Sequence, residues 1–385
     1  MPRFSADVLI AGAGVIGCSI AYHLALRGAK VEVFDKGSIG REASWAGAGI
    51  LGPQSESDQA GPFLEICLRS RRSYPALAAR LLEETGIDIE YETTGVLYVM
   101  ESEAERRDLE QRARWQQAEH LAVEILSAEE ARKREPRLTS RIQGALHFPE
   151  DHQVHSPRLV EALAAAARSR GVLFHEHCEV ARVEAQSGQV DITTSADRHS
   201  TRYLVLAAGA WSGRIPGIAA QFVPVEPVRG QIAVIKTEPG FLRHVLYCHE
   251  GYLVPRCGGT ILIGSTSERV GFNKSVTQEA VDSLQAMARR LLPDLQDAPL
   301  ATSCAGLRPA GPDAFPILGP IPTQPRVIVA TGHFRNGILL APLTGELIAG
   351  GILGGRFDPS INPFLPRLSP YEGSGVRGQG PGNES

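Results

Sequence analysis

A short glycine motif near the N-terminus constrains the fold of this chain more than any other feature of the sequence. The motif G-x-G-x-x-G, at residues 12–17, follows an apolar run at 7–11 and opens the stretch 15–28, in which apolar side chains recur at helical spacing. A second alternating run, 30–34, ends at Asp35. This order predicts a strand, a helix and a parallel second strand, with the glycine loop where dinucleotides bind.

Each position of the motif has a physical role. Gly12 permits the tight turn, Gly14 lets a pyrophosphate approach the backbone, and Gly17 lets the helix pack closely on the strand. The N-terminus of the helix carries a partial positive charge that suits the pyrophosphate, and Asp35 accepts hydrogen bonds from the adenosine ribose. Because an acid at this position repels a 2′-phosphate, we expect NAD or FAD and not NADP.

The composition is that of a globular protein and excludes several classes of function. The chain has 385 residues, 43% of them hydrophobic and 21% charged, which allows two or three domains. Its net charge of −4 excludes the basic field that a nucleic-acid backbone requires. Six cysteines without a C-x-x-C pair argue against structural zinc and a disulfide framework, and favour a reducing, cytoplasmic compartment. No apolar run reaches the roughly 18–20 residues of a membrane span, so none is expected.

Two polar clusters have ordinary structural interpretations. His147, His152 and His155 match no standard metal-ligand spacing, and we interpret them as loop and capping residues before a helix. No metal site is therefore predicted. The basic stretch 69–72 is interpreted as a solvated helix face.

Periodicity along the chain predicts alternating helices and strands, followed by a region rich in strands. Between 36 and 62 the chain is rich in Gly, Ala and Ser and lacks periodicity, which in a compact domain indicates a functional loop. The strands near 220–270 have no helices between them, so they predict an antiparallel sheet. We expect helices over 63–84, 102–119, 127–134, 156–170, 276–292 and 338–353, and strands over 95–100, 172–175, 179–184, 190–194, 203–207, 230–235, 252–255, 261–264 and 327–330.

Beyond the glycine motif, five segments carry a family resemblance. They are 35–51 (DKGSIGREASWAGAGIL), 204–212 (LVLAAGAWS), 252–256 (YLVPR), 305–309 (AGLRP) and 332–342 (GHFRNGILLAP). With the motif, they span nearly the whole chain. The chain resembles the D-amino-acid-oxidase-like superfamily of FAD-dependent oxidoreductases, and is most similar to the glycine oxidases of thiamine biosynthesis.

The resemblance implies an α/β fold with two domains. A Rossmann-like FAD-binding domain with a parallel sheet would be discontinuous, formed by 1–90 with 145–215 and 306–358. An α+β substrate-binding domain with a largely antiparallel sheet would comprise 91–144 and 216–305. The tail 366–385, rich in Gly, Ser and Pro, is expected to be disordered.

The resemblance also implies that FAD binds non-covalently. Where sarcosine-oxidase relatives attach the flavin through a cysteine, this chain has Gly306, and the nearby Cys304 is interpreted as a buried small apolar residue. The N-terminus of the helix at 338–353 would stabilise negative charge on the reduced flavin. The implied contacts are Gly12, Gly14, Val15, Ile16 and Gly17 at the pyrophosphate; Asp35 and Lys36 at the ribose; Ala43, Ser44, Ala48, Gly49 and Ile50 around the phosphate and flavin; Val180 at the adenine; and His333, Phe334, Arg335, Asn336, Gly337, Ile338 and Leu339 along the flavin ring.

Three catalytic residues are implied at the substrate. Arg308 would hold the substrate carboxylate as a bidentate pair, for which a planar guanidinium is well suited. Tyr252 would add a phenol hydrogen bond to the same carboxylate, and the main-chain carbonyl of Arg335 would accept a hydrogen bond from the substrate amine. We expect Tyr247 at the border of the pocket and Glu250 facing solvent.

The implied reaction is oxidative deamination of glycine or another small amine-bearing acid, such as sarcosine or a D-amino acid. Hydride transfer to the flavin would give an imine, which hydrolyses to an oxo acid and ammonia, while dioxygen reoxidises the flavin and gives hydrogen peroxide. The product would supply the thiazole branch of thiamine biosynthesis. Three alternatives remain open: a D-amino-acid dehydrogenase with a different acceptor, an oxidase of 2-hydroxy acids, which would need a base, and a non-catalytic FAD-binding subunit. The resemblance is also compatible with a homo-oligomer.

Overall fold

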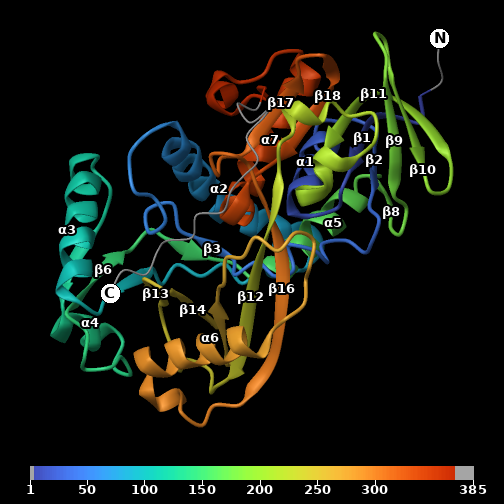
Figure 1. Ribbon diagram of the computed structural model, residues 1–385. Helices are drawn as coiled ribbons and strands as arrows, with labels where there is room; N and C mark the ends of the chain where they lie inside the picture. The colour runs from blue at the N-terminus through green and yellow to red at the C-terminus, as the bar shows by residue number, and fades with distance from the viewer. Residues whose placement is uncertain (1–3, 369–385) are drawn as a thin grey trace, which may run out of the picture.

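The computed structural model describes residues 4–368, and two large β-sheets organise it (Figure 1). In the first sheet, the neighbours of β1 and β2 run parallel, whereas β17, β9 and β10 are antiparallel additions at its edges. Its strands in spatial order are β17 (Ile317–Ile321), β18 (Gln324–Thr331), β11 (Arg198–Leu206), β1 (Ala6–Ala11), β2 (Val31–Phe34) and β8 (Leu173–His175), and β10 (Val190–Thr194) joins β11 to β9 (Val180–Ala185).

Four helices cover the first sheet and form the largest apolar core. They are α1 (Val15–Ala25), α2 (Pro62–Thr85), α5 (Ser156–Arg168) and α7 (Gly337–Gly354). Helix α1 is apolar on all sides because it lies between the sheet and its neighbours α5 and α7. Helices α1 and α7 cross closely at Gly345, where an added Cβ would lie 2.4 Å from the Ser19 hydroxyl oxygen. That hydroxyl donates instead to the carbonyl of Ala341, at 2.7 Å.

The second sheet is antiparallel except for its β4–β13 pair. In spatial order its strands are β16 (Leu300–Ala310), β12 (Glu226–Lys236), β15 (Thr260–Gly264), β14 (Gly251–Arg256), β13 (Val245–Cys248), β4 (Val96–Met100), β6 (Gly144–Phe148) and β5 (Glu124–Ser127). A small pair, β3 (Ile50–Leu51) with β7 (His152–Gln153), lies apart from both sheets. The short 3₁₀ helices are η1 (Gly209–Arg214), η2 (Ala220–Phe222), η3 (Pro293–Leu295), η4 (Phe334–Asn336) and η5 (Pro359–Phe364).

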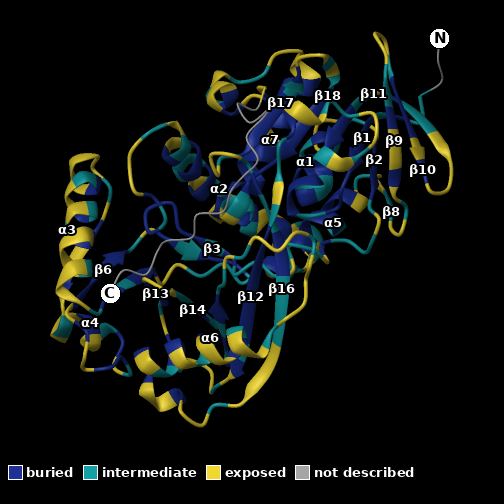
Figure 2. Cartoon of the chain, viewed as in Figure 1, coloured by how far each residue is buried: buried dark blue, intermediate teal, exposed yellow. Residues whose placement is uncertain are grey.

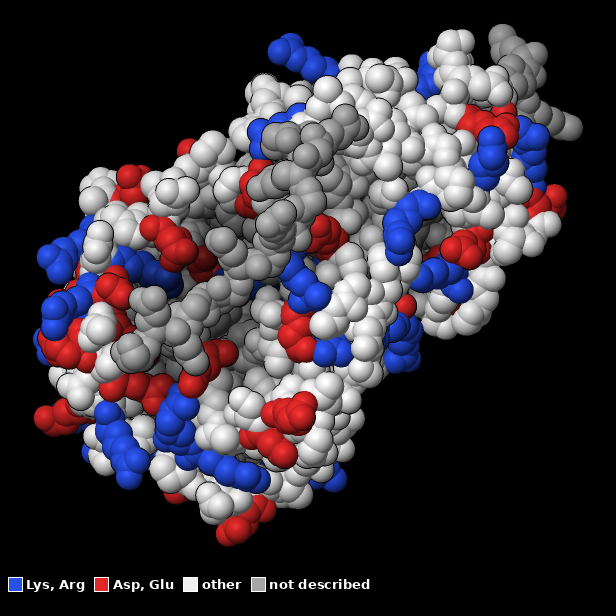
Figure 3. Space-filling model, viewed as in Figure 1, with Lys and Arg blue, Asp and Glu red and all other residues white. Residues whose placement is uncertain are grey.

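Three amphipathic helices accompany the second sheet: α3 (Glu103–Ala118), α4 (Ala128–Arg134) and α6 (Gln278–Leu291). Helices α3 and α4 begin at capping boxes, with Ser102 and Ser127 as the N-caps. Figure 2 shows the exposed outer faces of α3 and α6, whereas the strands beneath them are buried. On the face drawn in Figure 3, acidic and basic side chains are interspersed, and neither sign forms a continuous field.

The predicted fold class is confirmed: an α/β fold with a mostly parallel and a mostly antiparallel sheet. Sequence periodicity did not predict β5, β6, β13, β16 or β17. Strands β16 and β17 contain glycine and proline, residues typical of turns, and are strands because they pair with β12 and β18. The domain boundaries stay a prediction. If the domains followed the sheets, the boundaries near residues 145 and 306 would move. The reason is that β6 and the whole of β16 belong to the second sheet.

The expectation that no apolar run is long enough for a membrane span is wrong for one segment. Residues 334–354 form a helical segment that is long and apolar enough to cross a membrane by length and composition. However, 72% of its most apolar window is buried inside the protein, where it packs against α1 and α2. It is therefore a core helix of the protein.

Several interpretations of single residues also need correction. Arg71, in the stretch expected to be a solvated face, is buried, with 4% of its surface exposed. Cys304 is only partly buried. His147 lies within β6 and His152 within β7, not in loops, and only His155 caps a helix, accepting a hydrogen bond from the Arg158 main-chain N–H at 3.4 Å. The expected disorder of 366–385 falls, from residue 369 onward, outside the described residues.

Candidate active site

A cavity of about 460 Å³ is lined by residues of both sheets. Its lining includes the glycine turn after β1 and Asp35, which follows β2, together with Tyr252 on β14 and Arg308 on β16. Residues of the segment 42–58 and of the start of α7 also line the cavity. The cavity therefore joins the predicted dinucleotide site to the predicted carboxylate site.

The glycine turn has the geometry that the motif predicts. Gly12 has φ of +106°, and an added Cβ would lie 2.4 Å from the Ala207 carbonyl oxygen. A Cβ on Gly17 would lie 1.9 Å from the carbonyl oxygen of Gly12, so this glycine allows α1 to pack on its own loop. At Gly14, a Cβ would meet only the Ser44 hydroxyl, at 3.3 Å, which leaves the side facing the cavity free for a ligand.

Asp35, which follows β2, links the two loops around this turn by hydrogen bonds. Asp35 accepts hydrogen bonds from the main-chain N–H groups of Ala13, at 2.7 Å, and Gly37, at 2.8 Å. Burial raises the pKa of Asp35, while these two hydrogen bonds favour its ionised form. The Ser44 hydroxyl accepts from the N–H of Val15, at 3.0 Å, and so ties the second loop to the first turn of α1.

Two helix N-termini face the cavity. The N-cap residues of α1 and α7, Gly14 and Asn336, make no side-chain capping hydrogen bond. Residues of both first turns line the cavity, which gives it partial positive charge at two points. Next to α7, His333 is fully buried and contacts the Thr344 hydroxyl at 3.1 Å. Burial lowers the pKa of His333 to about 3, so the imidazole is neutral.

Arg308 is held in place by polar atoms that carry no charge. Its Nη1 donates to the carbonyl of Thr266, at 3.0 Å, and its Nη2 donates to the hydroxyl of Ser265, at 2.5 Å. Within residues 4–368 it makes no ion pair with a carboxylate. An added Cβ on Gly230 would lie 2.2 Å from Nη2, so the guanidinium lies directly against this backbone. The arrangement leaves a positive charge in the cavity that an anionic ligand can neutralise.

The second arginine of the site is already paired. Arg335 lies 3.2 Å from Glu56 Oε2, and the Tyr247 hydroxyl donates to Glu56 Oε1 at 2.5 Å. The rings of Tyr247 and Tyr252 are 5.7 Å apart. Because Glu56 neutralises the Arg335 side chain, Arg308 is the arginine of this pair that is free to bind a carboxylate.

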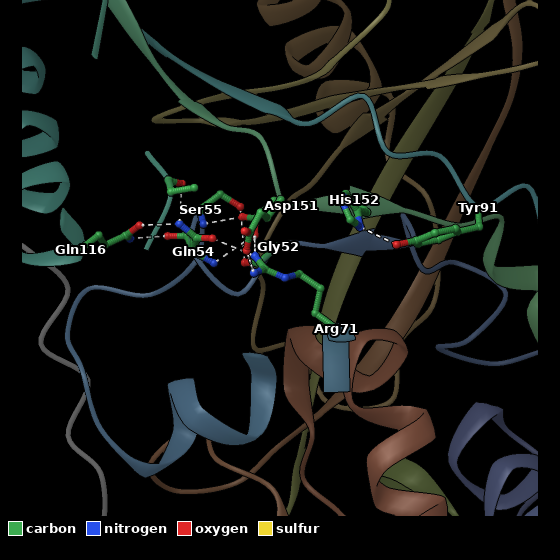
Figure 4. Close-up of polar contacts among 10 residues, drawn as sticks. Gly52, Gln54, Ser55, Arg71, Tyr91, Gln116, Asp151 and His152 are labelled. Atoms are coloured by element: carbon green, nitrogen blue, oxygen red, sulfur yellow. Dashed lines mark hydrogen bonds and ion pairs between the residues drawn. The ribbon is translucent and has the colours of Figure 1, made fainter. Parts of the chain in front are cut away.

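A buried network fixes the loop that carries Glu56 (Figure 4). Arg71 reaches from α2 to Asp151, at 2.9 Å, and to the side-chain oxygen of Gln54, at 2.8 Å. Asp151 also accepts from the N–H of Ser55, at 2.7 Å, and Gln116 of α3 donates to the Gln54 carbonyl, at 2.8 Å. Three separate elements therefore hold this wall of the cavity. In the same view His152 contacts the Tyr91 hydroxyl, at 2.6 Å, apart from the network.

Nearly all residues predicted at the site line the same cavity. Gly17, Asn336 and Leu339 do not. Glu250, expected to face solvent, is exposed at the cavity rim and pairs with Arg290. The predicted residues that line the cavity are Gly12, Gly14, Val15, Ile16, Asp35, Lys36, Ala43, Ser44, Ala48, Gly49, Ile50, Val180, Tyr247, Tyr252, Arg308, His333, Phe334, Arg335, Gly337 and Ile338.

The sequence prediction missed several residues of the cavity. Among them are Glu56, Tyr98 and Arg112. The aperiodic stretch 36–62 indicated a functional loop that contains Glu56, but no motif marked this residue within it. The partners of Glu56 lie far away in the sequence, so only the tertiary structure brings them together.

Comparison with known proteins gives the class of protein that this fold and cavity define. A family model described as "DAO: FAD dependent oxidoreductase" matches residues 7–350. The chain is 38% identical to a glycine oxidase of Geobacillus kaustophilus, over 89% of this chain and 92% of that protein. It is 36% identical to the "Bifunctional protein ThiO/ThiG" of Trichormus variabilis, over 93% of this chain and 54% of that protein. A crystal structure of the Geobacillus kaustophilus glycine oxidase superimposes with a TM-score of 0.91, covering 96% of this chain and all of that one, at 36% identity.

The chain therefore belongs to the DAO family of FAD-dependent oxidoreductases. Within this family it is a glycine oxidase-like enzyme, as the sequence resemblance predicted.

The residues of the cavity fit FAD. Gly14 leaves open space where a pyrophosphate would approach the N-terminus of α1. The uncapped N-terminus of α7 and the neutral His333 lie where the family resemblance implies the flavin ring. Both features suit a cofactor that carries phosphates and gains negative charge on reduction.

Proposed function

We propose that this enzyme oxidises glycine or another small acid with an amine on its α carbon, such as sarcosine or a D-amino acid. The observation that carries the proposal is the guanidinium of Arg308, which lines the cavity of the predicted FAD residues and makes no ion pair within residues 4–368. A carboxylate bound there lies inside the cavity that serves the cofactor. The names of the similar proteins support an amino-acid substrate.

Each proposed substrate contact has a separate role. Arg308 binds the carboxylate through two parallel N–H groups, which fixes both the position and the rotation of a small molecule. Tyr252 donates its phenol proton to the same carboxylate, and the main-chain carbonyl of Arg335 accepts a hydrogen bond from the amine. A neutral amine needs no general base among these residues before its α C–H bond is broken.

FAD held by the residues of the cavity would supply a hydride acceptor that dioxygen can reoxidise, with two protons taken up to give hydrogen peroxide. The substrate becomes an imine, and water then replaces the nitrogen. For glycine the balance is glycine, dioxygen and water in, and glyoxylate, ammonia and hydrogen peroxide out.

We also propose that FAD binds without a covalent bond. Gly306 lines the cavity at the position where sarcosine-oxidase relatives carry a flavin-linked cysteine, and glycine offers no nucleophile. Acid precipitation should therefore release all of the yellow cofactor into the supernatant, whereas cofactor that stays in the pellet would contradict the proposal.

The setting of the reaction is part of the proposal. All six cysteines are free, which agrees with a reducing cytoplasmic compartment. The relation to glycine oxidases of thiamine biosynthesis suggests that the imine or glyoxylate supplies thiazole synthesis. A homo-oligomer remains compatible with this account.

Replacing Arg308 with alanine tests the proposal. We expect kcat/KM for the amine substrate to fall by about a hundredfold or more, because a charged partner of the bound carboxylate is lost. FAD content should stay unchanged, because the hydrogen bonds of Arg308 go to Ser265 and Thr266 and none goes to the glycine turn. Arg182→Ala, on the exposed face of β9, is the matched control. Turnover that survives the loss of Arg308 would contradict the site.

A further inference from the structure

The orientation of Arg308 depends on a polar segment, residues 265–268, that follows β15. Its guanidinium donates to the Ser265 hydroxyl, at 2.5 Å, and to the Thr266 carbonyl, at 3.0 Å. The backbone of Gly230 also lies so close that a Cβ would be 2.2 Å from Nη2. The guanidinium therefore keeps its position only while segment 265–268 keeps its own.

Glu268 holds this segment to β12. Its Oε1 accepts hydrogen bonds from the Thr266 hydroxyl, at 2.5 Å, and from the side-chain amide of Gln231, at 2.8 Å. Its Oε2 pairs with the guanidinium of Arg229. The main chains of Arg229 and Glu268 exchange two further hydrogen bonds, of 2.8 and 3.0 Å. The Glu268 carboxylate thus connects Thr266, which contacts Arg308, with Arg229 and Gln231 of β12.

The Glu268 carboxylate also determines which of two neighbouring arginines, Arg229 or Arg308, is available to bind a ligand. Arg229 on β12 and Arg308 on the neighbouring strand β16 both border segment 265–268. Arg229 is buried, with 4% of its surface exposed, and its charge needs a partner. Because Glu268 pairs with Arg229, it does not compete for Arg308. Glu268 itself does not line the cavity, so it cannot touch a bound substrate.

We propose that Glu268 is a positioning residue for substrate binding: through Thr266 it holds the Arg308 guanidinium in the orientation that receives a carboxylate. This inference rests on the proposed function of Arg308. Bidentate binding of a small acid tolerates little rotation of the guanidinium, so loss of the Glu268 charge weakens carboxylate binding without removing the arginine. FAD binding is unaffected, because none of these contacts involves the loops around the glycine turn.

The experiment compares Glu268→Gln and Thr266→Val with wild-type holoenzyme. Glutamine preserves the size of the side chain but cannot neutralise Arg229, and valine removes the hydroxyl that Glu268 binds. Glu226→Gln is the matched control. Glu226 lies on β12, like Arg229, and the substitution breaks its exposed ion pair with Arg269. The readouts are KM and kcat for glycine, the Kd of acetate measured by perturbation of the flavin absorbance, and the FAD content.

We expect both variants to raise KM and the Kd of acetate by about tenfold or more, with kcat changed by less than about threefold and FAD content unchanged. The double variant should be little worse than either single variant, because both act through the same contact. Values of KM and Kd equal to those of wild type or of the control would overturn the inference. If Glu268→Gln fails to fold, the KM and the Kd of acetate of Thr266→Val test the inference.

Failure of the proposed function would look different. If no amine reduces the wild-type flavin, the reaction is wrong, but the acetate titration still tests whether Glu268 positions Arg308. If acetate does not bind to the wild-type enzyme at all, the carboxylate site and the positioning role are both contradicted.

Discussion

At the scale of single residues, the site depends on a glycine as well as on charged side chains. The guanidinium of Arg308 lies against Gly230, where any Cβ would overlap it. The overlapping atoms belong to the end of a long side chain, so the inexpensive response to a larger residue is a displaced guanidinium and not an unfolded strand. The proposed carboxylate site therefore depends on the absence of a side chain at this position.

This geometry predicts the effect of Gly230→Ala. We expect kcat/KM for the amine substrate to fall by about tenfold or more, while the thermal unfolding temperature and the FAD content stay close to those of wild type. Gly258→Ala is the control, since no atom lies within 4 Å of its added Cβ and the residue is in the turn between β14 and β15. Equal activity of the two variants would contradict the tight contact at Arg308.

At the scale of elements, two ion pairs fix segments that line the cavity. Arg71 and Asp151 fix the loop that carries Glu56, and Arg229 and Glu268 fix the segment that carries Ser265. Each pair joins elements far apart in the sequence, and each pair's arginine is buried. Such a pair costs much when it is broken, because the remaining charge stays buried without a partner.

Arg71→Met tests the first pair. Its removal leaves Asp151, which is fully buried, without a charged partner, so the free energy of unfolding should fall by about 3–5 kcal/mol. Urea unfolding of the holoenzyme measures the change. Lys133→Met, which breaks the exposed pair with Glu129 on α4, should leave the unfolding midpoint unchanged. A similar small effect at Arg71 would mean that the network does not support the loop.

The second pair predicts a dependence on pH. Burial raises the pKa of Glu268, but hydrogen bonds from Arg229, Thr266 and Gln231 outweigh it and lower the pKa from 4.5 to about 2. Because the folded-state pKa is the lower one, the stabilisation is complete above about pH 4.5 and is lost as the pH falls toward 2.

The difference in unfolding free energy between wild type and Glu268→Gln should therefore be larger at pH 7 than at pH 3. Urea unfolding at the two pH values measures it. A difference that stays constant, or that grows on acidification, would contradict an ionised and hydrogen-bonded Glu268.

At the scale of the whole molecule, the sequence predicted what depends on local patterns. The glycine turn, Asp35 and the helix at 338–353 follow from residues close together in the chain, and the structure has them where the motif predicts. Contacts between distant segments could not be predicted in this way. Arg71 looked like a surface charge because its partner Asp151 lies 80 residues further along, and β16 was not predicted because it is a strand only through its pairing with β12.

The same limit explains the predicted site. Arg308 was identified by its family motif, but its lack of a carboxylate partner within residues 4–368, and the contacts of Glu56 and Glu268, come from the tertiary structure. The fold brings the cofactor loops of the first sheet and the arginine of the second sheet into one cavity. The central claim of this account is that a small amine-bearing acid bound at Arg308 reduces the flavin in that cavity.

Anaerobic mixing of the purified yellow holoenzyme with glycine tests this claim most directly, with sarcosine, D-alanine and glycolate in parallel and air admitted afterwards. We predict bleaching of the flavin absorbance by glycine or another of the amines and not by glycolate, followed by rapid recolouring and one hydrogen peroxide per flavin when air enters. Bleaching by an amine with slow recolouring would indicate a dehydrogenase with another acceptor. Bleaching by glycolate alone, or by none of the four acids, would contradict the account.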